Sequence, residues 1–303
     1  MKTRAIAQSA FLIAVSCADG AFAGVALFAN ATDTIQVSSG TTLSGASTYE
    51  ARILFTADFN RTGIVFDEWT NGAEDKALYV GPGNPGTLRA FNWPVNETEV
   101  LIVSTEVTLD VWHHVAVVFD GSEERMYLDG GLVGSRAATG TIGNSAGLPA
   151  IGAISRLPVV SGFGGYIDWL RVSDISRYSG PSFPPPVDQP ASDASTQLLF
   201  YFDEAPGGTT ATDQSSFHRD GTLGVGFGGA TSPLLLSGPL QRSDVNGDGT
   251  VSVGDVFYLI NDLFAGGPPP LGAGDMNSDG LVNVSDVFFL INYLFAGGPP
   301  PAG

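Results

Sequence analysis

The sequence contains a single cysteine, Cys17, and this scarcity limits the chemistry available to the rest of the chain. Without a second thiol the chain can form no internal disulfide, and metal sites built on several thiolates are excluded. Basic residues are also few: 13 Lys and Arg stand against 31 Asp and Glu, which gives a formal net charge of −18. A field of that sign repels phosphate backbones and anionic membrane surfaces, so nucleic acid is excluded as a partner and cations are favoured.

No apolar run is long enough to predict a membrane-spanning helix, and the best candidate is a short interrupted stretch near the start. Lys2 and Arg4 precede this stretch, and the small-x-small sequence at 21–23 follows it. Residues 1–23 are therefore expected to be a secretory signal peptide that is removed on export. Two alternatives remain open, namely an ordinary N-terminal helix and a lipobox that would lipidate Cys17. The expected location is extracellular.

A twelve-residue acidic segment occurs twice near the other end, as DVNGDGTVSVGD at 244–255 and as DMNSDGLVNVSD at 275–286. Calcium loops of this length take ligands from positions 1, 3, 5, 7, 9 and 12 and place Gly at position 6. Both copies have Gly at position 6 and an oxygen donor at every ligand position: Asp244, Asn246, Asp248, the Thr250 carbonyl, Ser252 and Asp255, then Asp275, Asn277, Asp279, the Leu281 carbonyl, Asn283 and Asp286. One copy could be a polar surface turn, but the duplication predicts two Ca²⁺ sites.

A short amphipathic helix is expected after each loop. Gly266 and Gly297 follow where a left-handed cap would end each helix, with prolines behind them. Neither helix is long enough to be stable alone, so their apolar stripes should pack against each other. The expected stripes are Val256, Leu259, Ile260, Leu263 and Phe264, and then Val287, Leu290, Ile291, Leu294 and Phe295. Val251 and Val282, at loop position 8, are expected to bridge the loops by a short β-contact.

The duplicated EF-hand-like loop and exiting helix, with Asp at position 12 and no entering helix before residue 244, resemble a type I dockerin domain over residues 243–296. The resemblance implies calcium-dependent folding and docking to a cohesin-like domain on a scaffold protein. Members of that family usually carry a Ser/Thr-type pair at loop positions 10 and 11. Here those positions are 253–254, Val-Gly, and 284–285, Val-Ser, so only Ser285 follows the family's pattern.

Residues 24–233 are expected to form an all-β sandwich, because short alternating apolar runs are separated throughout by Gly, Asn-Gly, Asp-Gly and Pro. The clearest part predicts a β-meander. A strand at 112–119 leads to a turn at 120–121, a returning strand at 125–129 and a second turn at 129–131.

Five ordered motifs in this region resemble the strands of a bacterial laminin G-like domain, of the concanavalin A-like jelly-roll superfamily. They are GVALFANATDTIQVSSG, WHHVAVVFDG, MYLDGGLVG, AIGAI and FGGYIDWLRVSDISRY, and they span most of residues 24–178. The resemblance implies a jelly-roll β-sandwich. It also implies that Asp168, in the G-x-I-D motif, holds a third, structural calcium ion; an alternative is a carboxylate that fixes a turn.

The stretch from 196 to 233 admits two interpretations. It is similar to sequence that opens or trails laminin G-like modules, so it is either a returning strand of the same sandwich or a truncated second module. A segment of this length is too short to bury its own core, which favours the returning strand. Residues 234–242 are then expected to be a linker, followed by the dockerin-like module at 243–303.

The sandwich shows no sequence pattern of a catalytic site. Glycosidases on this fold need two carboxylates on one face, which on a strand means alternate positions. The acidic pairs at 67–68 and 203–204 are adjacent, so each pair would point to opposite faces. His113 and His114 are adjacent too, with one expected to be packed and the other to lie on an open face.

Sugar recognition would instead use exposed aromatic residues in loops. Trp69 and Trp93 lie among turn residues and are the candidate ligand-binding residues, whereas Trp112 and Trp169 are expected in the core. The sequence therefore favours a secreted, non-catalytic protein that binds a polysaccharide or a cell-surface glycan or protein and docks through calcium-loaded loops. The alternative is an enzyme of polysaccharide catabolism, a glycoside hydrolase or lyase, that carries a dockerin.

Overall fold

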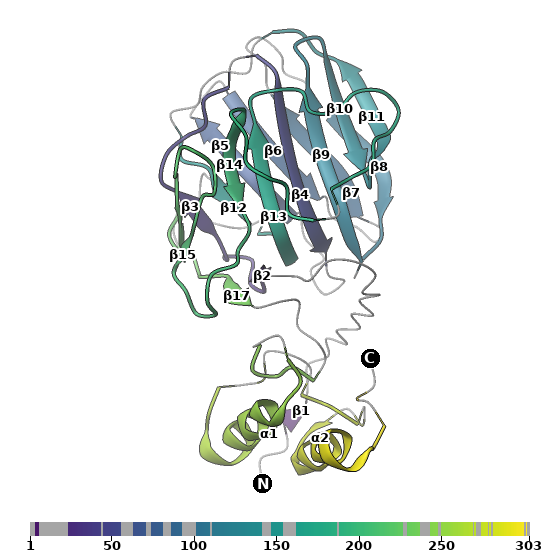
Figure 1. Ribbon diagram of the computed structural model, residues 1–303, viewed down its shortest axis with the longest axis vertical. Coiled ribbons are helices and arrows are strands. Elements are labelled where there is room, and N and C mark those ends of the chain that lie inside the picture. Colours follow the sequence, from purple (N-terminus) through teal and green to yellow (C-terminus); the bar gives the residue numbers. More distant parts are fainter. Residues whose placement is uncertain are drawn as a thin grey trace. The chain divides into compact units, whose positions relative to one another are not determined.

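The computed structural model (Figure 1) divides the chain into two compact units, Asp19–Leu235 and Leu236–Gly303 with Met1–Ala18. The structure describes residues 4–5, 24–43, 45–55, 63–70, 74–80, 86–92, 101–109, 111–140, 147–153, 162–186, 188–226, 229–236, 243–247, 250–268, 270, 274–277, 279, 281–299 and 301. Each unit is considered by itself.

The described residues of the larger unit form two antiparallel sheets of eight strands each. The first sheet has the order β11 (Gly131–Ala137), β10 (Glu123–Leu128), β9 (Trp112–Phe119), β4 (Ser47–Phe55), β13 (Gly165–Ser173), β2 (Val25–Phe28) and β17 (Leu234–Leu236), and β14 (Thr196–Phe200) also pairs with β13. The second sheet has the order β15 (Thr210–Ala211), β16 (Gly221–Leu223), β3 (Ile35–Val37), β12 (Ala150–Ile151), β5 (Gly63–Thr70), β6 (Glu74–Val80), β7 (Gly86–Asn92) and β8 (Leu101–Val107). The expected mainly-β two-sheet sandwich is confirmed.

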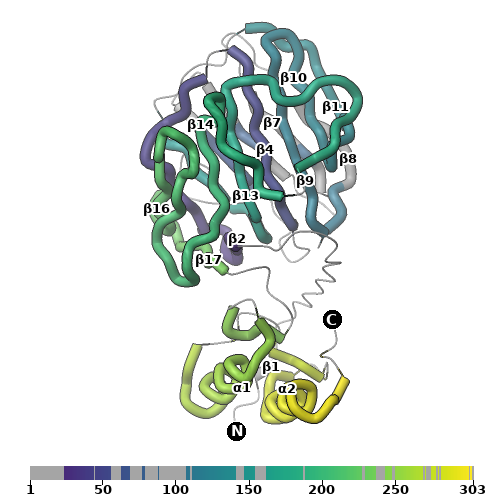
Figure 2. Tube along the Cα trace, in the orientation of Figure 1, coloured from purple at the N-terminus to yellow at the C-terminus, as the bar shows by residue number. Residues whose placement is uncertain are grey.

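The main core lies between the two sheets because alternate residues of a strand point to the same face. In β4 and β9, for example, Ile53 and Val115 belong to this core, whereas their neighbours point outward. The outward face of the first sheet is buried as well, because Ala116 and Tyr127 pack under Phe183. The chain between β13 and β14, residues 174–195, covers this face and is called the covering segment (Figure 2).

The predicted β-meander is confirmed, since β9, β10 and β11 follow one another and pair antiparallel. Asp129 and Gly130 join β10 to β11 with φ angles of 49° and 76°. Two successive residues with positive φ are typical of the type I′ turn, which matches the twist of a hairpin. The returning strand begins at Glu123, two residues earlier than the pattern predicted.

Residues beyond 195 add strands to both sheets. β14 pairs with β13, β16 pairs with β3, and β17 lies beside β2. This pairing is that of a returning segment of the same sandwich rather than of a second module. β17 ends at Leu236, so the first three residues of the expected linker at 234–242 form a strand.

The smaller unit contains α1 (Val253–Ile260), a π-helical turn η1 (Asn261–Ala265) that continues it, β18 (Leu281–Val282) and α2 (Val284–Ala296). Gly266 and Gly297 have φ angles of 73° and 68°, so the predicted left-handed caps are confirmed. The β-contact expected between Val251 and Val282 is not present among the described residues. Val282 pairs instead with Arg4 of β1 (Arg4–Ala5), and both valines pack beside the helical core.

The two helices pack against each other, as predicted, but only part of each expected stripe is buried. Val245, Val256, Leu259, Met276, Val287 and Leu290 form the core of this unit. Ile260, Phe264 and Phe295 were expected in that core, but they are 36%, 61% and 68% exposed. That part of the prediction is wrong, because these three residues lie on the far side of their helices. Within the described ranges, no helix has both the length and the apolar character needed to cross a membrane.

Candidate functional site

Both candidate calcium loops end in a fully buried aspartate that also begins a helix. Asp255 Oδ1 accepts hydrogen bonds from the backbone N–H groups of Val245 and Asn246 at 2.9 and 3.2 Å. Its Oδ2 accepts one from the Ser252 N–H at 2.8 Å, which completes a capping box at the start of α1. The last loop residue therefore joins the beginning of the loop to the beginning of the helix.

The second loop repeats this arrangement. Asp286 Oδ1 accepts from the N–H groups of Met276 and Asn277 at 2.8 and 3.3 Å, and Oδ2 accepts from the Asn283 N–H at 2.9 Å. The Asn283 side chain caps α2 as Ser252 caps α1. Two equivalent sites follow from the two equivalent sequences.

The side chains of the earlier loop residues accept hydrogen bonds from the backbone of their own loop. Asp244 Oδ1 accepts from the Gly247 N–H at 2.8 Å in the first loop. In the second loop Asp275 and Asn277 both accept from the Asp279 N–H, at 3.1 and 2.9 Å. The side chains at position 1 of both loops and at position 3 of the second loop are thus hydrogen-bonded to the backbone of their own loop. Asp248, at position 5 of the first loop, lies outside the described residues.

In the second loop, the surroundings of Asp286 disfavour the charged form of its carboxylate. Burial raises the pKa of Asp286, backbone hydrogen bonds from Asn283, Asn277 and Met276 lower it, and the charge on Asp275 raises it again, with a net increase. No Lys or Arg occurs within residues 243–303 to neutralise these carboxylates. A set of donors made only of oxygen atoms suits a hard divalent cation such as Ca²⁺. Within the described residues, no three His, Cys, Asp or Glu side chains are gathered into a complete metal site.

Each helix also carries a second apolar stripe that faces away from the helical core. In the first helix this outer stripe consists of Val253, Phe257, Ile260 and Phe264, spaced i, i+4, i+7 and i+11 on one face. In the second helix the equivalent Phe288 and Phe295 are 65% and 68% exposed. The sequence analysis missed Phe257 and Phe288. The signal for them is that FYLI and FFLI are apolar on more faces than one buried stripe requires.

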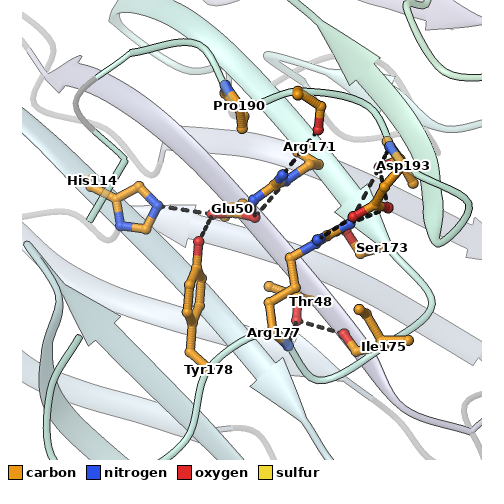
Figure 3. A network of polar contacts seen from close by, with 12 residues as sticks. Thr48, Glu50, His114, Arg171, Ser173, Ile175, Arg177, Tyr178, Pro190 and Asp193 are labelled. Atoms are coloured by element: carbon orange, nitrogen blue, oxygen red, sulfur yellow. Dashed lines mark hydrogen bonds and ion pairs between the residues drawn. The ribbon is translucent and has the colours of Figure 1, made fainter. Parts of the chain in front are cut away.

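A buried polar network lies on the outward face of the first sheet (Figure 3). Glu50, on β4, is its centre: Oε1 lies 2.7 and 2.6 Å from Nε and Nη2 of Arg171. Its Oε2 lies 3.0 Å from His114 Nε2 and accepts a hydrogen bond from the Tyr178 hydroxyl at 2.8 Å. Burial acts to raise the pKa of Glu50, but the His114 hydrogen bond and the Arg171 charge outweigh it, so this pKa is lowered.

The covering segment is held by the same network. Arg177 donates to both carboxylate oxygens of Asp193 at 2.8 Å and to Ser173 Oγ at 2.6 Å. Thr48 Oγ1 accepts from the Arg177 N–H at 3.0 Å and donates to the Ile175 carbonyl at 2.7 Å. The network therefore fastens the covering segment to the sheet.

The expected placement of the two histidines is wrong in one respect, because both are buried. His113 Nδ1 lies 2.7 Å from Asp129 Oδ2, and its Nε2 lies 3.1 Å from the Thr108 carbonyl. His114 was expected to be open if His113 were packed, but the covering segment lies over it and Phe183 stacks edge-on against its ring at 5.7 Å. Sequence spacing gives no sign of such a cover.

The candidate sugar-binding tryptophans are placed differently from expectation. Trp69 lies within β5, opposite Asp75 of β6, and not in a turn. Trp93 lies outside the described residues. Trp169 is fully buried, as expected, whereas Trp112 is half-buried beneath the guanidinium group of Arg52 at 5.3 Å.

Asp168, the candidate for a third calcium ion, has a guanidinium partner. Its Oδ2 lies 3.0 Å from Nη1 of Arg52, and the residue is 3% exposed. Burial raises the pKa of Asp168 to about 6, although Arg52 acts in the opposite direction.

Asp67 and Glu68 are fully buried in β5, which leaves this acidic pair inaccessible to a substrate.

Comparisons with protein families separate the same two regions. Residues 29–179 match the laminin G-like model of the concanavalin A-like lectin/glucanases superfamily, and residues 242–295 match the dockerin type I domain. The chain carries a laminin G-like domain and a type I dockerin domain. Dockerin type I domains typically bind calcium and dock to cohesins. No curated protein matches the chain.

Solved structures share the sandwich fold. A candidate carbohydrate-binding protein from Bacteroides ovatus is 19% identical with a TM-score of 0.51, over 69% of this chain and 60% of that chain, less than two thirds of its length. A heptameric pentraxin from Limulus polyphemus is 19% identical with a TM-score of 0.43, over 53% and 80%. The CBM40 domain of a Ruminococcus gnavus sialidase, bound to α2,3-sialyllactose, is 15% identical with a TM-score of 0.38, over 47% and 89%. At 19% identity and a TM-score of 0.51, the likeness to the Bacteroides ovatus protein is one of fold alone.

Proposed function

We propose that this protein is exported without residues 1–23 and acts as a non-catalytic binding protein. Its dockerin domain attaches it to a cohesin-like partner, and its laminin G-like domain recognises a polysaccharide or a cell-surface glycan or protein. The observation that carries the proposal is the pair of equivalent loop-helix units, each with an exposed aromatic stripe. An extracellular setting agrees with the proposal, since both calcium and scaffold-bound cohesins are found there.

In the proposed function each loop holds one Ca²⁺, which supplies the positive charge that the domain lacks. The ligands in the first loop are Asp244, Asn246, Asp248, the Thr250 carbonyl, Ser252 and Asp255, and those in the second are Asp275, Asn277, Asp279, the Leu281 carbonyl, Asn283 and Asp286. Asp255 and Asp286 contribute most, because each also orients the first turn of its helix through the capping box. The loss of their mutual repulsion with the other carboxylates stabilises the folded domain.

The outer stripes supply the docking surface. Phe257 and Phe264 are seven residues apart, which places them two helical turns or about 10 Å apart along the helix. A partner would therefore need two apolar pockets at that spacing, and a basic rim would suit the acidic loops. Because positions 253 and 284 are valines, recognition depends on apolar anchors more than on the hydroxyl pair usual in this family. Either helix offers equivalent anchors.

The test measures calorimetric binding of the mature protein, in calcium, to type I cohesin domains encoded by the same organism. Phe257→Ser and Phe288→Ser should each retain binding, since the other helix still presents its stripe. The double variant should lose binding by at least about 30-fold, because a buried aromatic anchor typically contributes about 2 kcal/mol or more. Phe217→Ser, a change at an exposed phenylalanine of the sandwich, is the matched control. Unchanged binding by a double variant that still folds with calcium would refute this docking surface.

A glycan array with the mature protein tests the laminin G-like domain. Trp69→Ala and Trp93→Ala are the variants expected to weaken any sugar binding. Trp112→Ala, at a half-buried position, is the control that shows what the loss of a tryptophan outside the candidate site does to binding. The enzymatic alternative, a glycoside hydrolase or lyase, requires new reducing ends or unsaturated products from a polysaccharide panel. Their appearance would overturn the non-catalytic assignment.

A further inference from the structure

Two strands share one edge of β13, and the point where they meet is Asp168. β2 pairs with β13 as far as Ile167, opposite Ala26, and β14 begins to pair at Leu170, opposite Phe200. On the other edge, the ladder to β4 shifts register between Ile167 and Trp169. Asp168 therefore sits in a gap between two ladders. The junction is defined here as Gly24, Asp168, Phe202 and Asp203.

Gly24, the residue just before β2, lies in close contact with the chain that leaves β14. It is buried, and a Cβ on it would lie 2.3 Å from the Phe202 carbonyl oxygen and 2.8 Å from Asp203 Cα. By ordinary bond geometry, its nitrogen is then within about 5.3 Å of Asp203 Cα. An aspartate side chain is long enough to bring its carboxylate from the Asp203 Cα to the Gly24 nitrogen. Phe202 itself has a φ of 58°, an uncommon conformation for a bulky residue and one that marks strain at the junction.

The junction has excess negative charge while residue 24 is joined to residue 23 by a neutral peptide bond. Burial raises the pKa of Asp168 to about 6, Arg52 opposes this, and the charge on Asp203 adds to it. The pKa of Asp203 is raised as well, by burial first, against a hydrogen bond from Gln189 and with a further contribution from Glu204. Arg52 already pairs with Asp168, so the two carboxylates together keep one uncompensated negative charge that a second cation would neutralise.

We propose that removal of residues 1–23 places the new α-ammonium group of Gly24 in this junction, where it forms ion pairs with Asp203 and Asp168. The inference rests on the proposed export. A signal peptidase hydrolyses the Ala23–Gly24 peptide bond with one water, which leaves a carboxylate on Ala23 and a protonated amine on Gly24. A charge created at a buried position is strongly unfavourable unless it is paired, and the two carboxylates would pair it. Cleavage thus supplies the sandwich with a positive charge next to these two carboxylates.

The same geometry restricts which residue can follow the cleavage site. Any side chain at position 24 would push a Cβ into the Phe202 carbonyl oxygen, so glycine is required there. The α-amine would otherwise be displaced from the two carboxylates.

The experiment titrates the α-amine directly in the secreted full-length mature protein. Lys76 is the only lysine after residue 23, so reductive ¹³C-methylation labels two amines, and Lys76→Arg leaves one. Mass spectrometry first identifies the N-terminal residue. With Gly24 at the N-terminus, the α-amine should titrate at least about one pH unit above its usual 7.7–8.0.

Asp203→Asn should abolish most of that increase, and Glu204→Gln should abolish much less of it, because the Glu204 carboxylate is held by the Thr212 N–H at 2.6 Å. The titratable and charged groups that influence one another around the junction are Asp168, Asp203, Glu204, Arg52 and the Tyr201 phenol. Because the amine pKa is raised on folding, its contribution is present below about pH 7.7 and is lost as pH rises through the raised value. The thermal stability advantage of the wild type over Asp203→Asn should therefore shrink between about pH 8 and 9.

An N-terminus other than Gly24 would overturn both the export proposal and this inference. Gly24 at the N-terminus with an ordinary amine pKa in the wild-type protein would overturn only the inference. That second outcome needs no variant, so a misfolded Asp203→Asn protein does not weaken the test.

Discussion

Replacing Glu50 by Gln keeps the size of the side chain and removes the charge that holds three partners. Arg171 would lose its ion pair at 2.6 Å, and the contacts with His114 and Tyr178 would weaken. Removing one partner of a buried ion pair typically costs 3–5 kcal/mol, and we expect about 3 kcal/mol because the amide oxygen still accepts one hydrogen bond. For a domain of this size the melting temperature should fall by roughly 6–12 °C.

The pH dependence supplies a second measure of the same prediction. The pKa of Glu50 is lowered on folding, so its stabilising effect is present above the unfolded value of about 4.3 and is lost as pH falls through the lower folded value. Wild type and Glu50→Gln should differ at pH 7 and converge below about pH 4. This is checked by calorimetry at both pH values.

Glu123→Gln is the matched control, because Glu123 forms a 2.6 Å ion pair with Arg125 at the surface. Such pairs contribute less than about 1 kcal/mol. Tyr178→Phe, which removes one hydrogen bond to Glu50, should cost about 1 kcal/mol. A Glu50→Gln protein within about 1 kcal/mol of wild type at pH 7 would show that the network does not fasten the covering segment.

Three further predictions concern the two domains. Residues 240–303 should gain helical circular dichroism on binding two calcium ions, and the double change Asp255→Ala with Asp286→Ala should abolish the gain; equal helicity in excess chelator would contradict calcium-dependent folding. Residues 24–236 should unfold cooperatively as an isolated monomer in calorimetry, because a chain of this length buries a sufficient core, and a broad non-cooperative transition would place the boundary elsewhere. Gly24→Ala should destabilise the mature protein by about 1–3 kcal/mol in chemical denaturation through the clash with the neighbouring carbonyl oxygen, and equal stability would argue against the close contact.

Local patterns were the part of the fold that the sequence predicted well. The turn at Asp129 and Gly130 depends on two residues that accept positive φ, and the caps at Gly266 and Gly297 depend on one each. Such conformations are decided by the residue itself, so they can be recognised without knowing what lies nearby. The duplicated loops were recognisable for the same reason.

Features that depend on distant contacts were not predictable. His114 is buried because Tyr178 and Phe183, which come much later in the chain, pack over its ring, and the Glu50 ion pair joins β4 to β13. Trp69 was assigned to a turn because polar residues follow it, but the β5–β6 hairpin extends through it. Phe264 was assigned to the core because helical spacing alone does not tell which of two apolar faces a partner helix will cover.

The two fully buried aspartates at the helix starts have a consequence for when the dockerin domain can fold. Each of these side chains is at once the last proposed calcium ligand and part of the cap that begins the helix, so ion loading and helix formation become a single event. The cytoplasm holds far less free calcium than the medium outside. Under the proposed calcium binding, the domain therefore stays unfolded and able to thread through a translocation pore, and it acquires its shape on arrival, without a chaperone to keep it open.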